Sequence, residues 1–305
     1  MTRYITARLL STLPVLLIVS VLVFLMIHLV PGDPVQIMLG ESGASAEQIA
    51  SIRTQLGLDK SLPVQYGRFI QQLLTGQVRS IRTQQPVVRE FWQLFPNTLQ
   101  LTVVSLVLAT LFGVVLGIVA ATHQHSWPDM LAMAGSFLGV SIPNFWLALV
   151  LIYFFAVRLG WLPATGAGSF KQLILPAVVL ALQQIALIAR LVRAHMIEVL
   201  QEEYIKTARA KGLRERSVLW THALRNALLP VITLLGLNFG YLLSGTVIIE
   251  TVFARPGIGR MIVDGILTKD FPLVQGAVLM TATIYLLVNL LTDLSYALLD
   301  PRISQ

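Results

Sequence analysis

The chain has 305 residues, of which 55% are hydrophobic and only 12% are charged, with a mean hydropathy of +0.75. Soluble proteins carry about 25% charged residues, so this composition favours a membrane protein. The net charge of +7 and the pI of 10.0 would fit a nucleic-acid binder. The basic residues lie mostly at the ends of apolar stretches, however, and we expect no nucleic-acid partner. The lack of cysteine excludes disulfides, thiol catalysis and cysteine-based metal sites.

About six stretches are apolar over the roughly 20 residues that a helix needs to cross a bilayer. The first begins after Arg3 and Arg8, and it is too long for the roughly 7–15 apolar residues of a cleaved signal peptide. The sequence therefore predicts an all-α polytopic membrane protein that forms a single domain over residues 1–305. Its spans are predicted at 9–30, 98–121, 131–157, 173–193, 229–249 and 276–298.

The distribution of lysine and arginine predicts the orientation, because short cytoplasmic loops are enriched in both. The long loop 31–97 is left out, since long loops cross largely regardless of charge. With the N-terminus and C-terminus inside, eleven basic residues are cytoplasmic and five are outside, although the short cytoplasmic loop 122–130 has none. The eleven are Arg3, Arg8, Arg190, Arg193, Lys206, Arg209, Lys211, Arg214, Arg216, Arg225 and Arg302; the five are Arg158, Lys171, Arg255, Arg260 and Lys269.

The outer loop 31–97 carries the signals of two amphipathic helices. Ser45 and Gln48 form a capping-box pattern, and Gly57 marks the end of that helix. Pro63 opens a second helix, which Gly76 ends. We expect these helices to lie on the membrane lipid surface rather than to receive a partner, because apolar stripes commonly rest on lipid.

The polar segment 194–228 between two apolar stretches is the most informative part of the chain. Its pattern predicts a helix, a glycine stop at Gly212 and a second helix. Glu202 and Glu203 suit a helix N-terminus, and Arg209 and Lys211 suit a helix C-terminus. A helical segment on the cytoplasmic face of a membrane protein is predicted to be a docking element.

Small residues recur every four positions in several spans, which lets helix backbones approach closely in lipid. We favour packing inside one subunit over a subunit interface for any single stripe. The stripes comprise Ser105, Ala109, Gly113, Gly117 and Ala121; Gly135 and Gly139; and Gly236, Gly240 and Ser244.

Polar residues at membrane depth are the candidates for a solute pathway. Pro143, between Ser141 and Asn144, breaks the third span near its middle and frees backbone carbonyls, which must face protein or a water-filled cavity. Asn238 raises the same question in the fifth span. For each of Pro143 and Asn238, a solute pathway and a buried interhelical hydrogen bond stay open as alternatives.

The sequence carries no pattern of catalysis or cofactor binding. No phosphate-binding loop of the G-x-x-x-x-G-K-[ST] type occurs, so ATP binding is not expected of this chain. Ionisable residues are nearly absent from the spans, whereas ion-coupled transporters usually need them. His123 and His125 are far more typical of a solvated loop than of a metal site. Any energy source must therefore act through a partner.

Motifs along nearly the whole chain resemble the permease subunits of ABC importers for dipeptides, oligopeptides, glutathione and nickel. The type resembled is the one with a long first outer loop. These motifs are Leu29–Pro34 (LVPGDP), Ser80–Thr83 with Pro86-Val87, Gly160–Pro163, Glu203–Gly212, His222–Pro230, Glu250–Phe253 and Pro256–Gly259. The segment Gly76–Arg79 departs from the usual glycine-aspartate turn, and Lys206–Ala208 stands where other importers have Glu-Ala-Ala.

The resemblance implies a type I importer transmembrane domain in a bacterial inner membrane. It also implies a second homologous permease subunit, two ABC ATPase subunits and an extracytoplasmic solute-binding protein. The segment 203–212 would be the cytoplasmic coupling helix that inserts into an ATPase groove. The ATPase-coupling residues would be Glu203, Tyr204, Thr207, Ala208, Arg209, Ala210, Lys211 and Gly212.

Three classes of function were weighed. An importer permease carrying peptides is favoured, with glutathione or a nickel complex as the alternative cargo. A secondary transporter would show ion-coupling carboxylates, and an intramembrane enzyme would need paired catalytic groups at membrane depth; the sequence shows neither. We therefore expect a transport protein that is not an enzyme, that needs no cofactor or metal, and whose pathway candidates are Ser141, Pro143, Asn144, Gly236, Asn238, Gly240 and Ser244.

Overall fold

The computed structural model describes residues 2–39 and 45–299, and these residues form helices without any strand. They divide into two compact units. The first unit holds the residues up to Thr98 and those from Pro256 onward, and the second unit is Leu99–Arg255. The boundary at Thr98 falls inside one long helix, α5 (Val87–Thr122). The single domain predicted over residues 1–305 stays a prediction.

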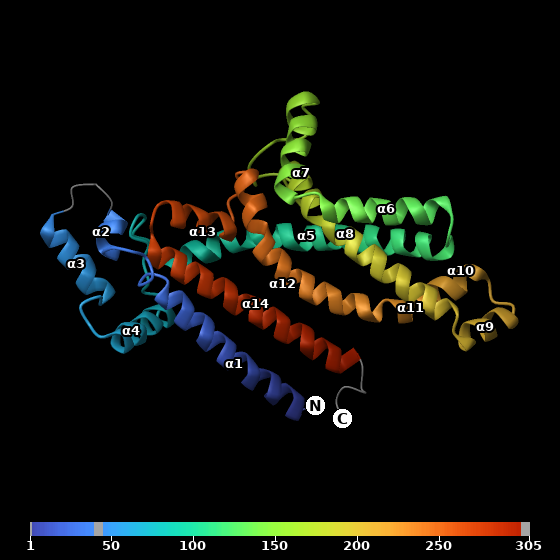
Figure 1. The fold of residues 1–305 in the computed structure, drawn as a ribbon, viewed down its shortest axis with the longest axis horizontal. Coiled ribbons are helices and arrows are strands. Elements are labelled where there is room, and N and C mark those ends of the chain that lie inside the picture. The colour runs from blue at the N-terminus through green and yellow to red at the C-terminus, as the bar shows by residue number, and fades with distance from the viewer. Residues whose placement is uncertain (1, 40–44, 300–305) are drawn as a thin grey trace. The chain divides into compact units, whose positions relative to one another are not determined.

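The first unit joins the two ends of the chain. In it α1 (Thr2–Leu25) packs along α14 (Phe271–Leu299), and α13 (Ile258–Leu267) packs on α14. The short helices α2 (Pro34–Leu39), α3 (Ala46–Leu56) and α4 (Leu62–Leu74) gather near the end of α1 (Figure 1). Its core holds the fully buried Val87, Phe91 and Ala277.

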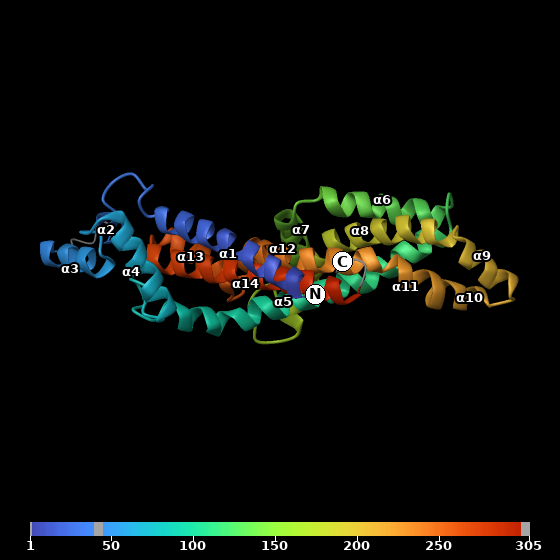
Figure 2. The same ribbon diagram turned by 90° about the horizontal axis from the view of Figure 1, so that it is seen from below.

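The second unit is organised around α8 (Lys171–Leu200), which packs against α6 (Trp127–Ser141), α7 (Asn144–Leu151) and α12 (Leu229–Val252). In Figure 2, which is turned by 90°, α6 again lies alongside α8. The π-helix η1 (Ile152–Arg158) extends α7. After α8 come α9 (Glu203–Ala210), α10 (Glu215–Ser217), the π-helix η2 (Val218–Ala223) and α11 (Leu224–Ala227).

Most of the predicted spans correspond to long helices. Among the described residues, three segments are long and apolar enough to cross a membrane: Val87–Thr122, Lys171–Leu200 and Phe271–Thr292. Two bent helix pairs would raise this number to five, and α1 contributes a shorter apolar segment at Leu10–Leu25. The third predicted span at 131–157 is broken near its middle, as Pro143 indicated, and α6 and the α7–η1 helix meet at an angle of 102°. The break lies at Ile142 and Pro143, where proline disfavours a helical conformation at the preceding residue.

The local signals of the outer loop are confirmed. Ser45 caps α3 in a capping box with Gln48, and Gly57 ends the helix with a φ of +69°. Proline stands in the first turn of α4, and Gly76 follows that helix with a φ of +68°. Helix α13 is an addition, since the sequence suggested no helix between the fifth and sixth spans.

The glycines of the second span pack inside the second unit. A Cβ atom built on Gly113 would lie 2.8 Å from the Ile188 side chain, and one built on Gly117 would lie 2.6 Å from Val192. Only glycine allows α5 and α8 to approach this closely, so packing within one subunit is confirmed for these two positions.

Candidate functional site

The predicted docking segment forms a separate helical layer beyond the end of α8 (Figure 1). Glu202 occupies the N-cap position of α9 in an extended conformation. The helix ends at Ala210, and Gly212 follows with a φ of +75°. The left-handed glycine predicted after this helix is therefore present.

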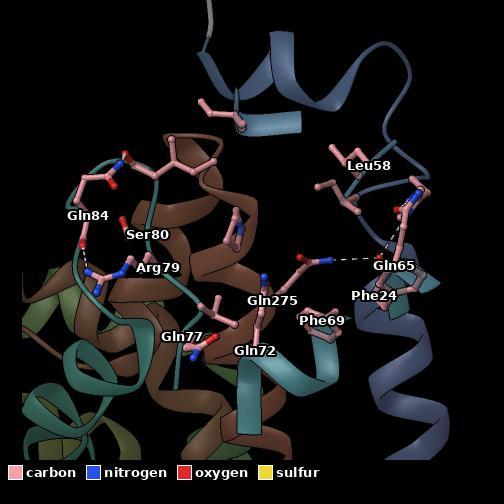
Figure 3. Close-up of a pocket in the computed structure, with 16 residues that line it drawn as sticks. Phe24, Leu58, Gln65, Phe69, Gln72, Gln77, Arg79, Ser80, Gln84 and Gln275 are labelled. Atoms are coloured by element: carbon pink, nitrogen blue, oxygen red, sulfur yellow. Dashed lines mark hydrogen bonds between the residues drawn. The ribbon is translucent and has the colours of Figure 1, made fainter. Parts of the chain in front are cut away.

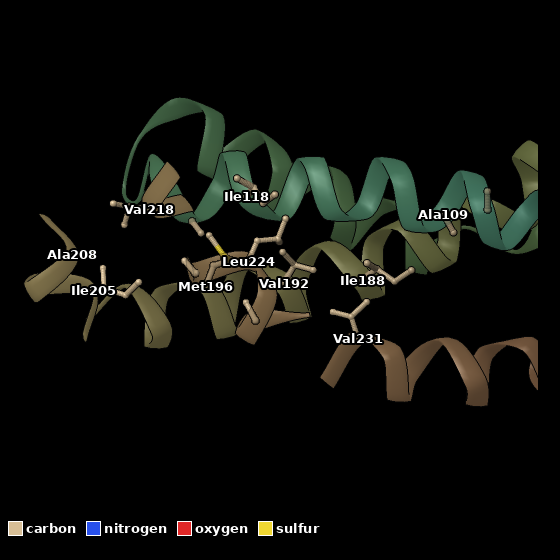
Figure 4. Packing of buried hydrophobic residues seen from close by; sticks show 14 residues of the cluster. Ala109, Ile118, Ile188, Val192, Met196, Ile205, Ala208, Val218, Leu224 and Val231 are labelled. Atoms are coloured by element: carbon tan, nitrogen blue, oxygen red, sulfur yellow. The ribbon is translucent and has the colours of Figure 1, made fainter. Parts of the chain in front are cut away.

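One face of α9 anchors the helix to the second unit. Ile205 is fully buried and Ala208 is 8% exposed, and both belong to a core cluster with Met196, Val192 and Val218 (Figure 4). Residues three apart share a helix face, so Ile205 and Ala208 together form the face of α9 that packs against the second unit. The rest of its circumference is available for another protein.

The other faces of α9 are polar, exposed and cross-linked to the following turn. Lys206 pairs with Glu203 at 2.7 Å, and the Arg209 guanidinium pairs with the Glu215 carboxylate at 2.6 Å. Hydrogen bonding to Glu215 raises the pKa of Arg209 above its ordinary value, so Arg209 stays charged. The Arg209–Glu215 pair joins α9 to α10, whereas the Lys206–Glu203 pair lies within α9.

Tyr204 ties α9 to the helix that returns toward the membrane. Its hydroxyl accepts a hydrogen bond from the Asn226 amide at 2.7 Å, while 40% of the residue is exposed. Of the eight residues predicted for coupling, Ala208 is therefore the one turned inward. Glu203, Tyr204, Thr207, Arg209, Ala210, Lys211 and Gly212 all lie on the exposed surface.

An ion pair that the sequence did not indicate joins α6 to α8 in the second unit. Arg193 of α8 donates to both carboxylate oxygens of Asp129 in α6, at 2.6 and 2.8 Å. Asp129 also accepts the backbone N–H of His125 at 3.1 Å. A basic side chain is thus present beside the loop 122–130, although the loop itself contains none. No signal in the sequence links residues 64 positions apart.

The three residues predicted at the helix break of the third span, Ser141, Pro143 and Asn144, have different surroundings. The Ser141 hydroxyl donates to the Phe137 carbonyl of its own helix, and Pro143 is exposed at the N-cap of α7. Asn144 turns toward α8 and donates to the Gln183 side-chain oxygen at 3.1 Å. An interhelical hydrogen bond is therefore present at this break, made by Asn144 rather than by backbone carbonyls.

The predicted residues of the fifth span lie in α12. Asn238 is only 7% exposed, and Gly240 is buried, whereas Gly236 is half-buried. The side chain of Ser244 lies outside the described residues. Their role in a solute pathway stays a prediction.

Gln183 and Gln184 are two polar residues that the sequence analysis overlooked in the span 173–193. Gln184 is 2% exposed, which is exceptional for a polar side chain within an apolar helix. Their signal was available, since they are adjacent uncharged polar residues in an otherwise apolar run.

A small pocket in the first unit is lined by amides, apolar side chains and the basic Arg79 (Figure 3). His28 bonds the buried Gln65 at 2.9 Å, and Gln275 donates to the backbone carbonyl of Val23 at 2.9 Å. The cavity volume of about 100 Å³ is well below the roughly 300–1,000 Å³ of drug-sized ligand sites. These contacts pack α1, α4 and α14 together and provide no room for a peptide.

No group of three or more potential metal-ligating side chains occurs within residues 2–39 and 45–299. The polar residues described above at the helix break and at positions 183, 184 and 238 are amides and hydroxyls, with no paired catalytic groups among them. An apolar helical body with an exposed polar helix beyond the end of α8 fits a membrane component that works with other proteins.

Comparison with known proteins identifies that class. Residues 113–305 match the family described as binding-protein-dependent transport system inner membrane component, and residues 1–102 match its N-terminal part. The chain belongs to this family and is the permease subunit of an ABC importer in the peptide and glutathione group. It is a transport component and not an enzyme.

Curated relatives match over nearly the full length. The glutathione transport system permease protein GsiC of Salmonella paratyphi A is 44% identical over 304 residues, which is 99% of each chain. The protein of the same name in Escherichia coli K12 is 43% identical over the same length.

Solved structures share the fold. The inward-facing MetNI methionine ABC transporter matches with a TM-score of 0.61 and 18% identity, covering 71% of this chain and 99% of that chain. An amino acid ABC transporter matches with a TM-score of 0.53 and 19% identity, over 70% and 94% of the two chains. The type I importer fold and a multi-pass inner-membrane location are therefore established, together with the general need for ATPase, permease and binding-protein partners.

Proposed function

We propose that this permease carries glutathione and related short peptides across the inner membrane. The observation that carries the proposal is the full-length similarity to glutathione permeases, 44% over 304 residues. Glutathione is itself a small peptide, so the peptide cargo expected from the sequence and the glutathione alternative belong to one chemical class. A nickel complex is the less supported cargo.

The cargo would pass between this subunit and a second, homologous permease. The candidates for that passage are the exposed Ser141 and Pro143 at the helix break, together with Asn144 beside them. None of these side chains carries a fixed charge, and an unpaired charge in a membrane costs at least about 2.5 kcal/mol. We therefore expect weak binding by the permease pair and tight binding by the extracytoplasmic solute-binding protein.

Coupling to ATP hydrolysis would occur through α9. The helix is anchored by Ile205 and Ala208, while the pairs Lys206–Glu203 and Arg209–Glu215 stiffen its exposed side. A rigid helix that projects polar side chains suits insertion into a groove of an ATPase subunit. Two ATPase subunits, one for each permease, would complete the importer.

The orientation proposed from the basic residues has both termini in the cytoplasm. The contact between Arg193 and Asp129 is consistent with this orientation, because it places the loop 122–130 beside Arg193, one of the eleven basic residues assigned to the cytoplasm. This loop was the one proposed cytoplasmic segment without a lysine or arginine.

Uptake in cells tests the cargo. The complete importer is expressed in a strain that cannot take up glutathione, with and without this subunit, and accumulation of radiolabelled glutathione is measured. We expect uptake only with the subunit present, and competition by unlabelled dipeptides. Uptake of nickel instead, with no accumulation of glutathione or of a labelled dipeptide, would contradict the proposal.

A further inference from the structure

Three amide side chains of the second unit, those of Asn144, Gln184 and Asn238, each keep one enclosed polar atom without a hydrogen-bond partner. The side-chain oxygen of Gln184 and the side-chain nitrogen of Asn238 are both fully enclosed and unpaired. Gln184 is 2% exposed and Asn238 is 7% exposed. Unpaired polar atoms are costly in an apolar interior, and most of all at membrane depth, where water cannot replace the partner.

Both residues lie on the apolar faces that α8 and α12 turn toward the core of the second unit. Gln184 is spaced three and four residues from the buried Ala181 and Ile188. Asn238 lies seven residues after the buried Val231 and four before the buried Leu242. Such spacings place each amide in the middle of an apolar helix stripe.

The two amides also lie at the same level of the α8–α12 packing. Ile188 shares one core cluster with Val231, and Leu180 shares the next cluster with Leu242. Gln184 stands midway between its two cluster members on α8, and Asn238 stands between its two on α12. Because α8 and α12 pack against each other and run in opposite directions (Figure 1), these spacings put the two amides at the same level, near the border between the two clusters.

The unpaired atoms are complementary. The Gln184 oxygen is an acceptor and the Asn238 nitrogen is a donor, so one hydrogen bond between them would satisfy both. A single polar pair in an apolar helix seam is known to fix the register of the two helices. Between α8 and α12, the acceptor and the donor of such a pair are both present, and no hydrogen bond joins them.

The amide next to Gln184 on α8 differs, because its side-chain oxygen is paired. Gln183, next to Gln184 on α8, accepts a hydrogen bond from Asn144 at 3.1 Å. That bond is made in this conformation, although the side-chain oxygen of Asn144 is itself enclosed and without a partner.

We propose that Gln184 and Asn238 form a register contact between α8 and α12 that is broken in this conformation and made in another conformation of the transport cycle. A shift of one helix by a fraction of a turn, as occurs at other switching interfaces, would join the two groups. The pair then favours the second conformation, because the cost of two unpaired atoms applies only to the first. The inference rests on the transport function of the family and not on the identity of the cargo.

Thermal unfolding of the assembled importer tests this inference, with and without trapping by ATP and vanadate. The double variant Q184L/N238L removes the unpaired atoms from one conformation and the hydrogen bond from the other. Where the pair is broken, we expect the midpoint of the double variant to be unchanged or raised; where the pair is made, we expect it to be lowered. The shifts measured with and without trapping should therefore differ by about 3 °C or more. Equal shifts in both conditions would overturn the proposal, since a fixed structural contact contributes equally to both.

The single variants sharpen the test. In the condition where the pair is made, Q184L or N238L leaves the remaining amide buried and unpaired, so each should lower the midpoint at least as far as the double variant does. Simple additivity of the two single effects would contradict a direct pair. Q183L is the matched control, because it removes a bond already made and should lower the midpoint alike in both conditions.

Discussion

Arg193 and Asp129 are joined by two parallel hydrogen bonds, so that α8 and the start of α6 are fixed to each other by one ion pair. The Asp129 side chain is 8% exposed and that of Arg193 is 26% exposed, so solvent screens the pair only in part. The geometry is the bidentate one that makes arginine–carboxylate contacts strong and specific. The pair lies in the same unit as α9 and stabilises the α6–α8 contact.

Asp129→Asn should therefore destabilise the protein by about 2–3 kcal/mol, since breaking a buried pair leaves an uncompensated charge and Arg193 retains some access to water. The measurement is the free energy of unfolding of the assembled importer. Asp264→Asn is the control, because the Arg260–Asp264 pair is exposed and 3.6 Å long. Its effect should stay within about 1 kcal/mol. Equal effects of the two variants would contradict a stabilising role for Asp129.

Gly212→Val should reduce uptake while insertion into the membrane survives. Nothing lies within 4 Å of an added Cβ, so the cost comes from the φ of +75° alone and is about 1–2 kcal/mol. That strain would turn α9 away from α10 and lower coupling between ATP hydrolysis and transport.

Gly160→Val is the matched control for Gly212, since Gly160 also has open space and a φ of +63°. It should cost similar stability without changing the ratio of cargo transported to ATP hydrolysed. Normal uptake by a well-expressed Gly212→Val importer would refute the coupling role of this segment.

Gly117→Ala should destabilise the protein by about 1–3 kcal/mol through overpacking against Val192 and the Ala189 carbonyl. Gly135→Ala in α6 should be neutral or slightly stabilising, because its Cβ meets nothing within 4 Å and alanine favours a helix. Thermal unfolding of the two variants checks the difference. A stable Gly117→Ala protein would show that α5 and α8 do not need this close approach.

The chain has no cysteine, so single introduced cysteines report the orientation without interference. Ser51→Cys in the outer loop should react with an impermeant thiol reagent in intact spheroplasts, and Ser217→Cys should react only after permeabilisation. The reverse labelling pattern would overturn the proposed orientation.

Local chemistry in the sequence predicted the elements that depend on neighbours in the chain. The capping box at Ser45, the glycine stop at Gly57 and the left-handed Gly212 are set by backbone groups within a few residues, so their patterns could be read directly. The apolar length of a span is equally local. This is why five of the six predicted stretches correspond to helices without a sharp break.

Contacts between distant residues could not be predicted in this way. Proline at position 143 indicated a break, but the 102° angle depends on how α7 packs against α8 and α12. The partner of Asp129 comes from another helix, and the burial of Gln184 depends on the helices around it. Within the docking segment, the sequence indicated the polar surface, whereas the inward role of Ile205 emerged only from the packing.

The sharp bend after α6 limits how the third crossing is made. With 15 residues, α6 is about 22 Å long, while the hydrocarbon core of a bilayer is about 30 Å thick. If α6 follows the membrane normal, the α7–η1 helix must run nearly parallel to the bilayer plane. Its Trp146, Tyr153 and Arg158 suit that interfacial position. In that arrangement the third crossing would be about 8 Å short, and the bilayer beside α6 should be locally thinner than elsewhere around the importer.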